Sequence, residues 1–115
     1  MYHVFYFTGN DQKISWEIQT ADSSVKQNRE HVEMYKNNVT TLQSKFIAFH
    51  VGLFWAIGTF IIKNDDSITV KCDEKIMYDC FQSNKEIDDE FIKKRIQFIK
   101  QLISQRKLKM KFELI

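Results

Sequence analysis

The stretch "KFIAFHVGLFWAIGTFIIK" runs from Lys45 to Lys63, and the seventeen residues between its two lysines carry no formal charge while His50 is neutral. A membrane helix needs about 20 mostly apolar residues to cross a hydrocarbon core about 30 Å thick. This stretch is shorter and includes a histidine, two glycines and a threonine. We therefore interpret it as a helix buried in a protein core, and keep a single membrane span as the weaker alternative.

The periodicity of this stretch predicts a helix from Thr40 to about Ile57. Apolar residues recur at steps of three and four in two neighbouring rows: Leu42, Phe46, Phe49, Leu53 and Ile57, and then Ile47, Val51 and Phe54. The opposite stripe is mostly small or polar: Thr41, Lys45, Ala48, Gly52, Trp55 and Thr59. Ala48 and Gly52 are expected to let the helix approach a sheet closely, and Gly58 to end it.

The first third of the chain predicts three antiparallel strands. Residues 2–8 are aromatic and β-branched almost throughout, which is typical of a central strand buried on both faces. Residues 13–20 alternate apolar and polar side chains, as expected of a strand with one wet face. Residues 31–36 alternate more weakly and follow a polar loop at 21–29, so we place the third strand there.

The remaining segments complete an α/β domain. They are a strand at 68–72, a helix at 73–82, a helix at 86–104 and a strand at 107–115. Ser83 and Glu86 have the spacing of a capping box for the third helix. The order β-β-β-α-β-α-α-β predicts a single domain over residues 1–115, with one five-stranded mixed sheet covered by helices.

Composition excludes several classes of function. The formal net charge of +2 gives no global field that would indicate nucleic acid or membrane. Cys72 and Cys80 form no CxxC pair, so the common zinc spacing is absent and free thiols are expected. The amino-terminal sequence has no basic region and no small-residue cleavage pattern. We expect a cytoplasmic protein without a signal peptide.

Three short motifs lie on the predicted elements or directly after them. They are Thr8-Gly9 after the first strand, Gly52, Leu53 and Ala56 on the buried helix, and Asp73 after the fourth strand. With the element order, they resemble the ribonuclease H family, whose patterns there are T-D-G, G-L-x-x-A and V-x-x-D-S. The resemblance covers nearly the whole chain and implies a ribonuclease H-like fold. Within that family, the chain is similar to the acid-poor connection domains of reverse transcriptases.

The resemblance also implies that catalytic acids are missing. Gly9 stands at the first acid position of the family, and Lys45 at or near the second; an alternative count places Thr41 there. Asp73 matches the third acid, and the helix that supplies the fourth has no counterpart within residues 1–115. Family members cleave with two Mg²⁺ ions held by several carboxylates. The expectation is a vestigial site with no nuclease activity, no metal and no cofactor.

Two residues have plainer interpretations as well. Asp73 can serve as the N-cap of the helix at 73–82, which requires no functional role. His50 has no ligand partner at helical spacing and is expected to be hydrogen-bonded or partly exposed. The rival hypothesis to a lost activity is a residual nuclease whose rearranged metal site uses Asp73 and Asp11.

A basic run is the remaining functional candidate. Between Phe91 and Phe112 the chain has eight Lys or Arg and no acid. The residues that we expect to contact nucleic acid are Lys93, Lys100, Arg106, Lys107, Lys109 and Lys111. Phe91 and Phe98 are assigned to the apolar ridge of their helix, so not to base stacking. The sequence thus predicts a non-catalytic scaffold or interaction module, which binds an unknown protein partner or itself, with weak nucleic-acid binding as a secondary function.

Overall fold

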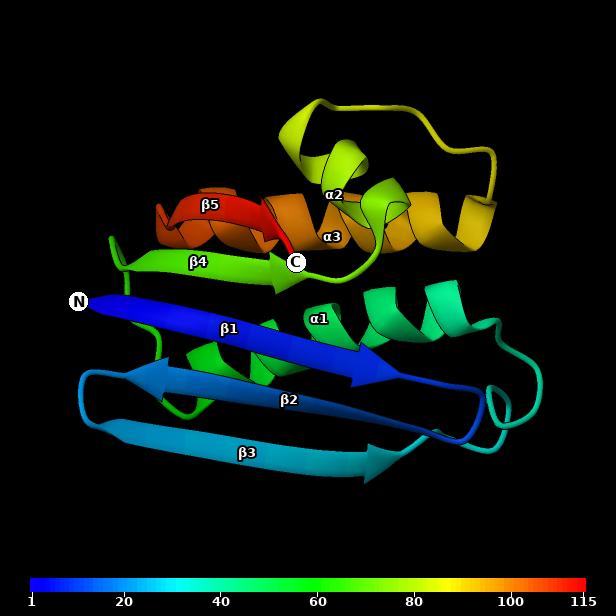
Figure 1. The fold of residues 1–115 in the computed structure, drawn as a ribbon, viewed down its shortest axis with the longest axis horizontal. Helices are drawn as coiled ribbons and strands as arrows, with labels where there is room; N and C mark the ends of the chain where they lie inside the picture. Colours follow the sequence, from blue (N-terminus) through cyan, green and yellow to red (C-terminus); the bar gives the residue numbers. More distant parts are fainter.

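The computed structural model describes residues 1–115 as one five-stranded sheet with three helices (Figure 1). The elements are β1 (Tyr2–Gly9), β2 (Lys13–Thr20), β3 (Ser23–Glu30), α1 (Thr41–Gly58), β4 (Ser67–Cys72), α2 (Lys75–Gln82), α3 (Glu90–Arg106) and β5 (Lys109–Leu114). The strands lie in the order β3-β2-β1-β4-β5. β1 pairs antiparallel with β2 and parallel with β4, and β5 extends the parallel side. The predicted element order and mixed sheet are confirmed.

The sheet has one covered face. In Figure 1, α1 and α3 lie behind the sheet, and no helix crosses in front of β1, β2 and β3. β1 is the central strand, as predicted, but only one of its faces is fully buried, through His3, Phe5 and Phe7. The prediction of burial on both faces was wrong, because Tyr2 and Tyr6 alternate with these residues and point to the open side.

α1 packs on the sheet with its small residues, as expected, and it buries Phe46, Phe49 and Leu53 of the first apolar row as well. Lys45, Ala48 and Gly52 are buried, whereas Phe54 is 64% exposed. A Cβ atom at position 52 would lie 2.8 Å from the rings of Phe5 and Trp16, so only glycine allows this approach. The expected close approach at Gly52 is confirmed, whereas Phe54 of the second apolar row lies outside the core. None of the helices combines the length and hydropathy that crossing a bilayer requires.

The third strand was misplaced by the sequence pattern. It spans Ser23–Glu30, the segment predicted as a polar loop, while residues 31–36 form turns. β3 is an edge strand whose backbone pairs along all of β2, with Val25 opposite Ile18. An edge strand that covers little of the core needs few apolar side chains, so its alternation is weak.

α3 begins later than predicted. Asp89 is its N-cap, and its carboxylate accepts a hydrogen bond from the Ile92 amide at 3.1 Å. Ser83 instead ends α2, where its amide donates to the Asp79 carbonyl, so the predicted box with Glu86 does not form. The ridge of isoleucines faces the core as predicted, but Phe98 is 52% exposed and does not belong to it.

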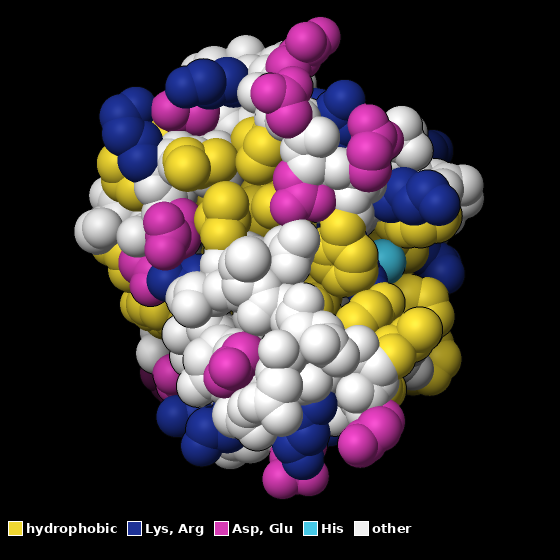
Figure 2. Space-filling model, turned by 90° about the vertical axis from the view of Figure 1, so that its right-hand side faces the viewer, with side chains coloured by type: hydrophobic (Ala, Val, Ile, Leu, Met, Phe, Trp, Pro, Cys, Tyr) yellow, Lys and Arg dark blue, Asp and Glu magenta, His cyan; other side chains and the backbone are white.

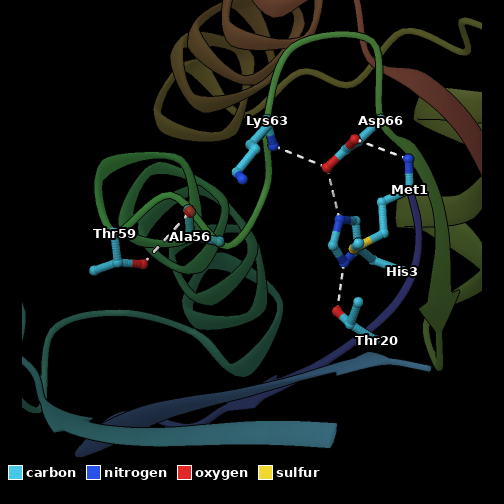
Figure 3. A network of polar contacts seen from close by, with 7 residues as sticks. All are labelled: Met1, His3, Thr20, Ala56, Thr59, Lys63 and Asp66. Carbon is cyan, nitrogen blue, oxygen red and sulfur yellow. Dashed lines mark hydrogen bonds and ion pairs between the residues drawn. The ribbon is translucent and has the colours of Figure 1, made fainter. Parts of the chain in front are cut away.

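A buried polar network ties the amino-terminal end of β1 to the segment before β4 (Figure 3). The Asp66 carboxylate accepts hydrogen bonds from the Met1 ammonium at 3.1 Å, the Lys63 amide at 2.9 Å and His3 Nε2 at 2.8 Å. His3 Nδ1 lies 2.5 Å from Thr20 Oγ1 on β2. Through these bonds, one carboxylate fixes three separate segments of the chain.

Candidate functional site

The parallel pairing of β1 with β4 brings the predicted site residues to one edge of the sheet. Tyr6 pairs with Lys71, so Gly9 and Asp73 both lie just beyond the paired region, at the carboxyl ends of neighbouring parallel strands. In open α/β sheets this edge is the common location of ligand sites. The first turns of α1 reach the same edge and supply Lys45.

The ammonium group of Lys45 lies at this edge of the sheet, beside two carboxylates. Its Nζ atom lies 3.1 Å from Asp73 Oδ2 and 3.0 Å from Glu74 Oε1, while the residue is only 9% exposed. Burial by itself would lower the pKa of Lys45, but the hydrogen bonds and charges of Glu74 and Asp73 outweigh it and raise that pKa above 10.5. The predicted N-cap role of Asp73 was wrong: Glu74 takes that position without a side-chain capping bond, and Asp73 binds the ammonium instead.

Gly9 is held against α1 too closely for any side chain. A Cβ atom there would meet the Ser44 hydroxyl and would come within 3.0 Å of the Ser44 backbone carbonyl. His31 closes the same corner, because its Nε2 donates to the Asn10 carbonyl oxygen at 2.9 Å and lies 2.8 Å from Ser44 Oγ. An aspartate at position 9 would require α1 to move away from the strand.

The carboxylates at this edge do not form a metal centre. No group of three or more His, Cys, Asp or Glu side chains in the chain has an arrangement that could hold a metal ion. Asp11 is exposed in the β1–β2 turn, where its backbone carbonyl accepts from the Asn37 amide. The two acids that are close together, Asp73 and Glu74, share one ammonium, which occupies an oxygen of each and halves their combined charge.

A second arrangement looks catalytic in outline. Asp66, His3 and Thr20 are linked in series, as are the acid, base and hydroxyl of a hydrolase triad. However, His3 is fully buried, and the main surface hollows are lined by other residues than Thr20. The network therefore has a structural role. Nothing in the sequence pattern pointed to it, because His3 lies inside a strand and Asp66 in a turn.

The six predicted basic residues do not lie on one surface. Lys93 and Lys100 line a hollow between α3 and the α2–α3 loop, together with Lys85. Lys109 and Lys111 alternate on β5 with core-facing Met110 and Phe112, so they point to the open face of the sheet. Arg106 and Lys107 stand at the turn between the two groups.

Three of these basic residues already have partners. Lys100 donates to the Asn84 side chain at 2.9 Å. Lys111 pairs with Glu113 at 3.2 Å, and Lys93 pairs with Glu90 at 3.4 Å. His50, as predicted, is hydrogen-bonded and partly exposed: Arg95 donates to its Nδ1 at 2.9 Å. Burial, and then the charge of Arg95, lower the pKa of His50 to about 4.

No family model and no curated protein matches this sequence. Solved structures do match. The RNase H1 of the halophilic archaeon Halobacterium salinarum superposes with a TM-score of 0.74 at 13% identity, over 100% of this chain and 86% of that one. LC11-RNase H1 in complex with an RNA/DNA hybrid gives 0.70 at 11% identity, over 98% and 84%.

A viral polymerase shares the same architecture. The foamy viral protease-reverse transcriptase gives a TM-score of 0.63 at 12% identity, over 97% of this chain and 21% of that one. All of these identities are too low to transfer an activity, but the TM-scores and the coverage of this chain show a shared fold. The chain therefore has a ribonuclease H-like fold.

Proposed function

We propose that this chain is a ribonuclease H-like domain that does not cleave nucleic acid and that acts through its surfaces as an interaction module. The observation that carries the proposal is the Lys45 ammonium, 3.1 Å from Asp73 and 3.0 Å from Glu74. Two-metal cleavage needs several carboxylates that are free to bind the ions. Here the two carboxylates that lie together are both bound to the chain's own cation.

The packing around Gly9 supports the same conclusion independently. The contact with Ser44 leaves no space for a carboxylate at the end of β1.

A cytoplasmic, reducing setting also fits the chain, because both thiols are free and buried, and burial raises the pKa of Cys72 to about 12.

The test is a cleavage assay with a labelled RNA–DNA hybrid in Mg²⁺ and in Mn²⁺, alongside titration calorimetry of both ions. The proposal expects no cleavage above background and no heat of specific binding. The alternative, a residual nuclease at Asp73 and Asp11, is favoured only by the enzymatic nature of the matching RNase H1 structures. Metal-dependent cleavage that is abolished in Asp73→Asn would establish that alternative and overturn ours.

Nucleic-acid binding is the second candidate function. It is supported by the exposed lysines of β5 and by a matching structure that holds an RNA/DNA hybrid. Because the basic residues fall into separate groups, we expect weak, salt-sensitive and sequence-independent binding. Fluorescence anisotropy with a hybrid and a matched duplex DNA, at low and physiological salt, measures it.

Two variants separate the groups of basic residues. In one, Lys107, Lys109 and Lys111 become Gln; in the other, Lys93 and Lys100 do. Loss of binding in the first variant alone would place the nucleic acid over β5 and the open sheet face. If both variants bind as tightly as the unmodified chain, these basic residues do not contribute to nucleic-acid binding.

A further inference from the structure

The outer side of α1 carries a groove beside α3. A hollow of about 290 Å³ is lined by His50, Val51, Phe54 and Arg95. A second hollow of about 190 Å³ also includes Val51 and Arg95 and extends to Ile47. The two hollows adjoin, since Val51 and Arg95 line both, and we call them together the α1–α3 groove. Ile47 and Phe54 are two helical turns apart, which is about 10 Å along the axis.

Large apolar side chains are exposed at this groove. Phe54 is 64% exposed, and Phe98 of α3, which is 52% exposed, stacks on the His50 ring with centroids 5.9 Å apart. His50 is the one histidine of the chain that is not buried. Figure 2, a view of one end of the molecule, shows hydrophobic side chains gathered beside a histidine. Exposed apolar patches of this kind mark interaction sites.

Arg95 stands in the groove without an acidic partner. Its guanidinium donates to His50 Nδ1 at 2.9 Å and to the Tyr35 hydroxyl at 3.0 Å, and lies over the rings of Tyr35 and Phe91. All of these partners are neutral. A guanidinium has five N–H donors, so most of its hydrogen-bonding capacity, and the whole of its charge, remain available to a carboxylate.

The surroundings do not supply that carboxylate. α1 has no acidic residue, and α3 has none after Glu90. Glu30 lines the far end of the second hollow, where it pairs with Lys36 at 3.6 Å. The groove thus combines apolar side chains with the half-buried Arg95, which has no acidic partner. A second cation, Arg29, also lines the second hollow, and its guanidinium lies over the Trp16 ring.

We propose that the α1–α3 groove binds an acidic amphipathic helix of a partner protein, with apolar side chains in the two hollows and a carboxylate between them on Arg95. The two-turn spacing of the hollows matches anchors at positions i and i+7 of a helix, with the acid at i+3 or i+4. The inference rests on the proposed role as an interaction module and names its partner class. It requires neither nucleic-acid binding nor the loss of cleavage.

The experiment pans a display library of random 16-residue peptides against the full chain and measures the selected peptides by fluorescence anisotropy. We expect enrichment of helical sequences with Asp or Glu between two large apolar residues. Arg95→Glu and Phe54→Ser should each weaken binding roughly tenfold or more. Lys94→Glu, a charge reversal next to Arg95, and Phe60→Ser, an exposed aromatic outside the groove, should leave binding unchanged.

A charge swap guards against damage to the fold. A selected peptide whose acid is replaced by Lys should bind Arg95→Glu better than it binds the unmodified chain. The proposal is overturned if selected peptides lack an acid, or if neither groove variant weakens them. Two rival occupants of the groove are tested with the same variant. The proposal is also overturned if Arg95→Glu leaves peptide binding unchanged but abolishes either a dimer seen by sedimentation or binding to phosphatidylglycerol vesicles. Hybrid cleavage and anisotropy on the same variants report the proposed function separately.

Discussion

Lys45 Nζ, carried by α1, lies 3.1 Å from Asp73 Oδ2 at the end of β4, so an ion pair joins the helix to the sheet at the carboxyl ends of β1 and β4. Lys45→Met keeps the volume of the side chain but removes its charge. We expect the free energy of unfolding in urea to fall by about 1–3 kcal/mol, because hydrogen bonds to charged groups are lost at a mostly buried position.

Lys75 provides the matched control. It pairs with Asp79 one helical turn away on α2, and its side chain is 73% exposed. Lys75→Met should change the free energy of unfolding by less than about 0.5 kcal/mol. Equal losses in the two variants would mean that the Lys45 ion pair is no more than a surface contact.

Lys45→Glu tests whether the charge of Lys45 is what would keep a metal ion from this edge. The substitution would place three carboxylates, those of positions 45, 73 and 74, at one edge of the sheet. Their repulsion should destabilise the chain, and Mn²⁺ should then raise its melting temperature through binding to the folded state. The unmodified chain should show no such rise. If Mn²⁺ does not change the melting temperature of the variant, then the close packing of Gly9 against Ser44, and not the charge of Lys45, prevents metal binding.

Two glycines should be intolerant of a methyl group. In Gly52→Ala the new Cβ would lie 2.8 Å from Phe5 and Trp16, and in Gly9→Ala it would press on the Ser44 backbone. Overpacking of this kind costs about 1–3 kcal/mol. Gly58→Ala is the control, since no atom lies within 4 Å of its added Cβ, and it should be neutral or stabilising. Chemical denaturation of the three variants measures the difference, and equal effects would contradict the packing of α1.

The fold was predictable where apolar residues are dense. The core strands and α1 were located from their apolar periodicity, and the order of the elements follows from them. β3 was not, because its one clear apolar residue, Val25, gives no alternation, and its position depends on the backbone of β2. The exposure of Phe54 on α1 was also missed, because Phe54 stands in one of the two apolar rows that were expected to be buried.

The site was predictable only in part. The resemblance placed Gly9, Lys45 and Asp73 at one site, and the structure brings these segments to one edge. That Lys45 would pair with both Asp73 and Glu74 depends on the register of β1 and β4 and on the tilt of α1, which no local pattern encodes. Arg95 was counted within a basic run, whereas its aromatic surroundings come from α1, α3 and the turn at Tyr35.

Asp66 should make the fold sensitive to acid. Burial alone would raise the pKa of Asp66, but the hydrogen bonds from Lys63, His3 and the Met1 ammonium outweigh it and lower that pKa from 3.8 to about 2. A depressed carboxyl pKa contributes stability above the unfolded value, and this contribution is lost as the pH falls from about 4 through 2.

Asp66→Asn should therefore lower the free energy of unfolding at pH 7 by about 2–3 kcal/mol, because its amide group cannot accept all three donors. It should also flatten the pH dependence between about 4 and 2. Urea denaturation at a series of pH values measures both effects. An unchanged slope in the variant would show that other carboxylates dominate acid unfolding.

His50 should remain neutral well below the usual pH for histidine. Because Arg95 can only donate, His50 Nδ1 must accept and the ring proton must sit on Nε2. Burial first, and the Arg95 charge second, hold its pKa at about 4. The unfolded chain binds this proton near pH 6.5, so the group reduces stability as the pH falls from 6.5 to 4. Titration of the ring signals by NMR measures the pKa directly.

Arg95→Gln separates the two causes. It removes the charge but retains a side-chain amide that can donate to His50, so the pKa of His50 should rise but stay below 6.5, since burial is the larger effect. Phe98→Ala, which uncovers one face of the stacked ring, should raise the pKa as well by admitting water. If Arg95→Gln alone restores a pKa near 6.5, the charge of Arg95 and not burial sets the pKa of His50. Water would then reach the His50 ring more freely than its stacking on Phe98 indicates.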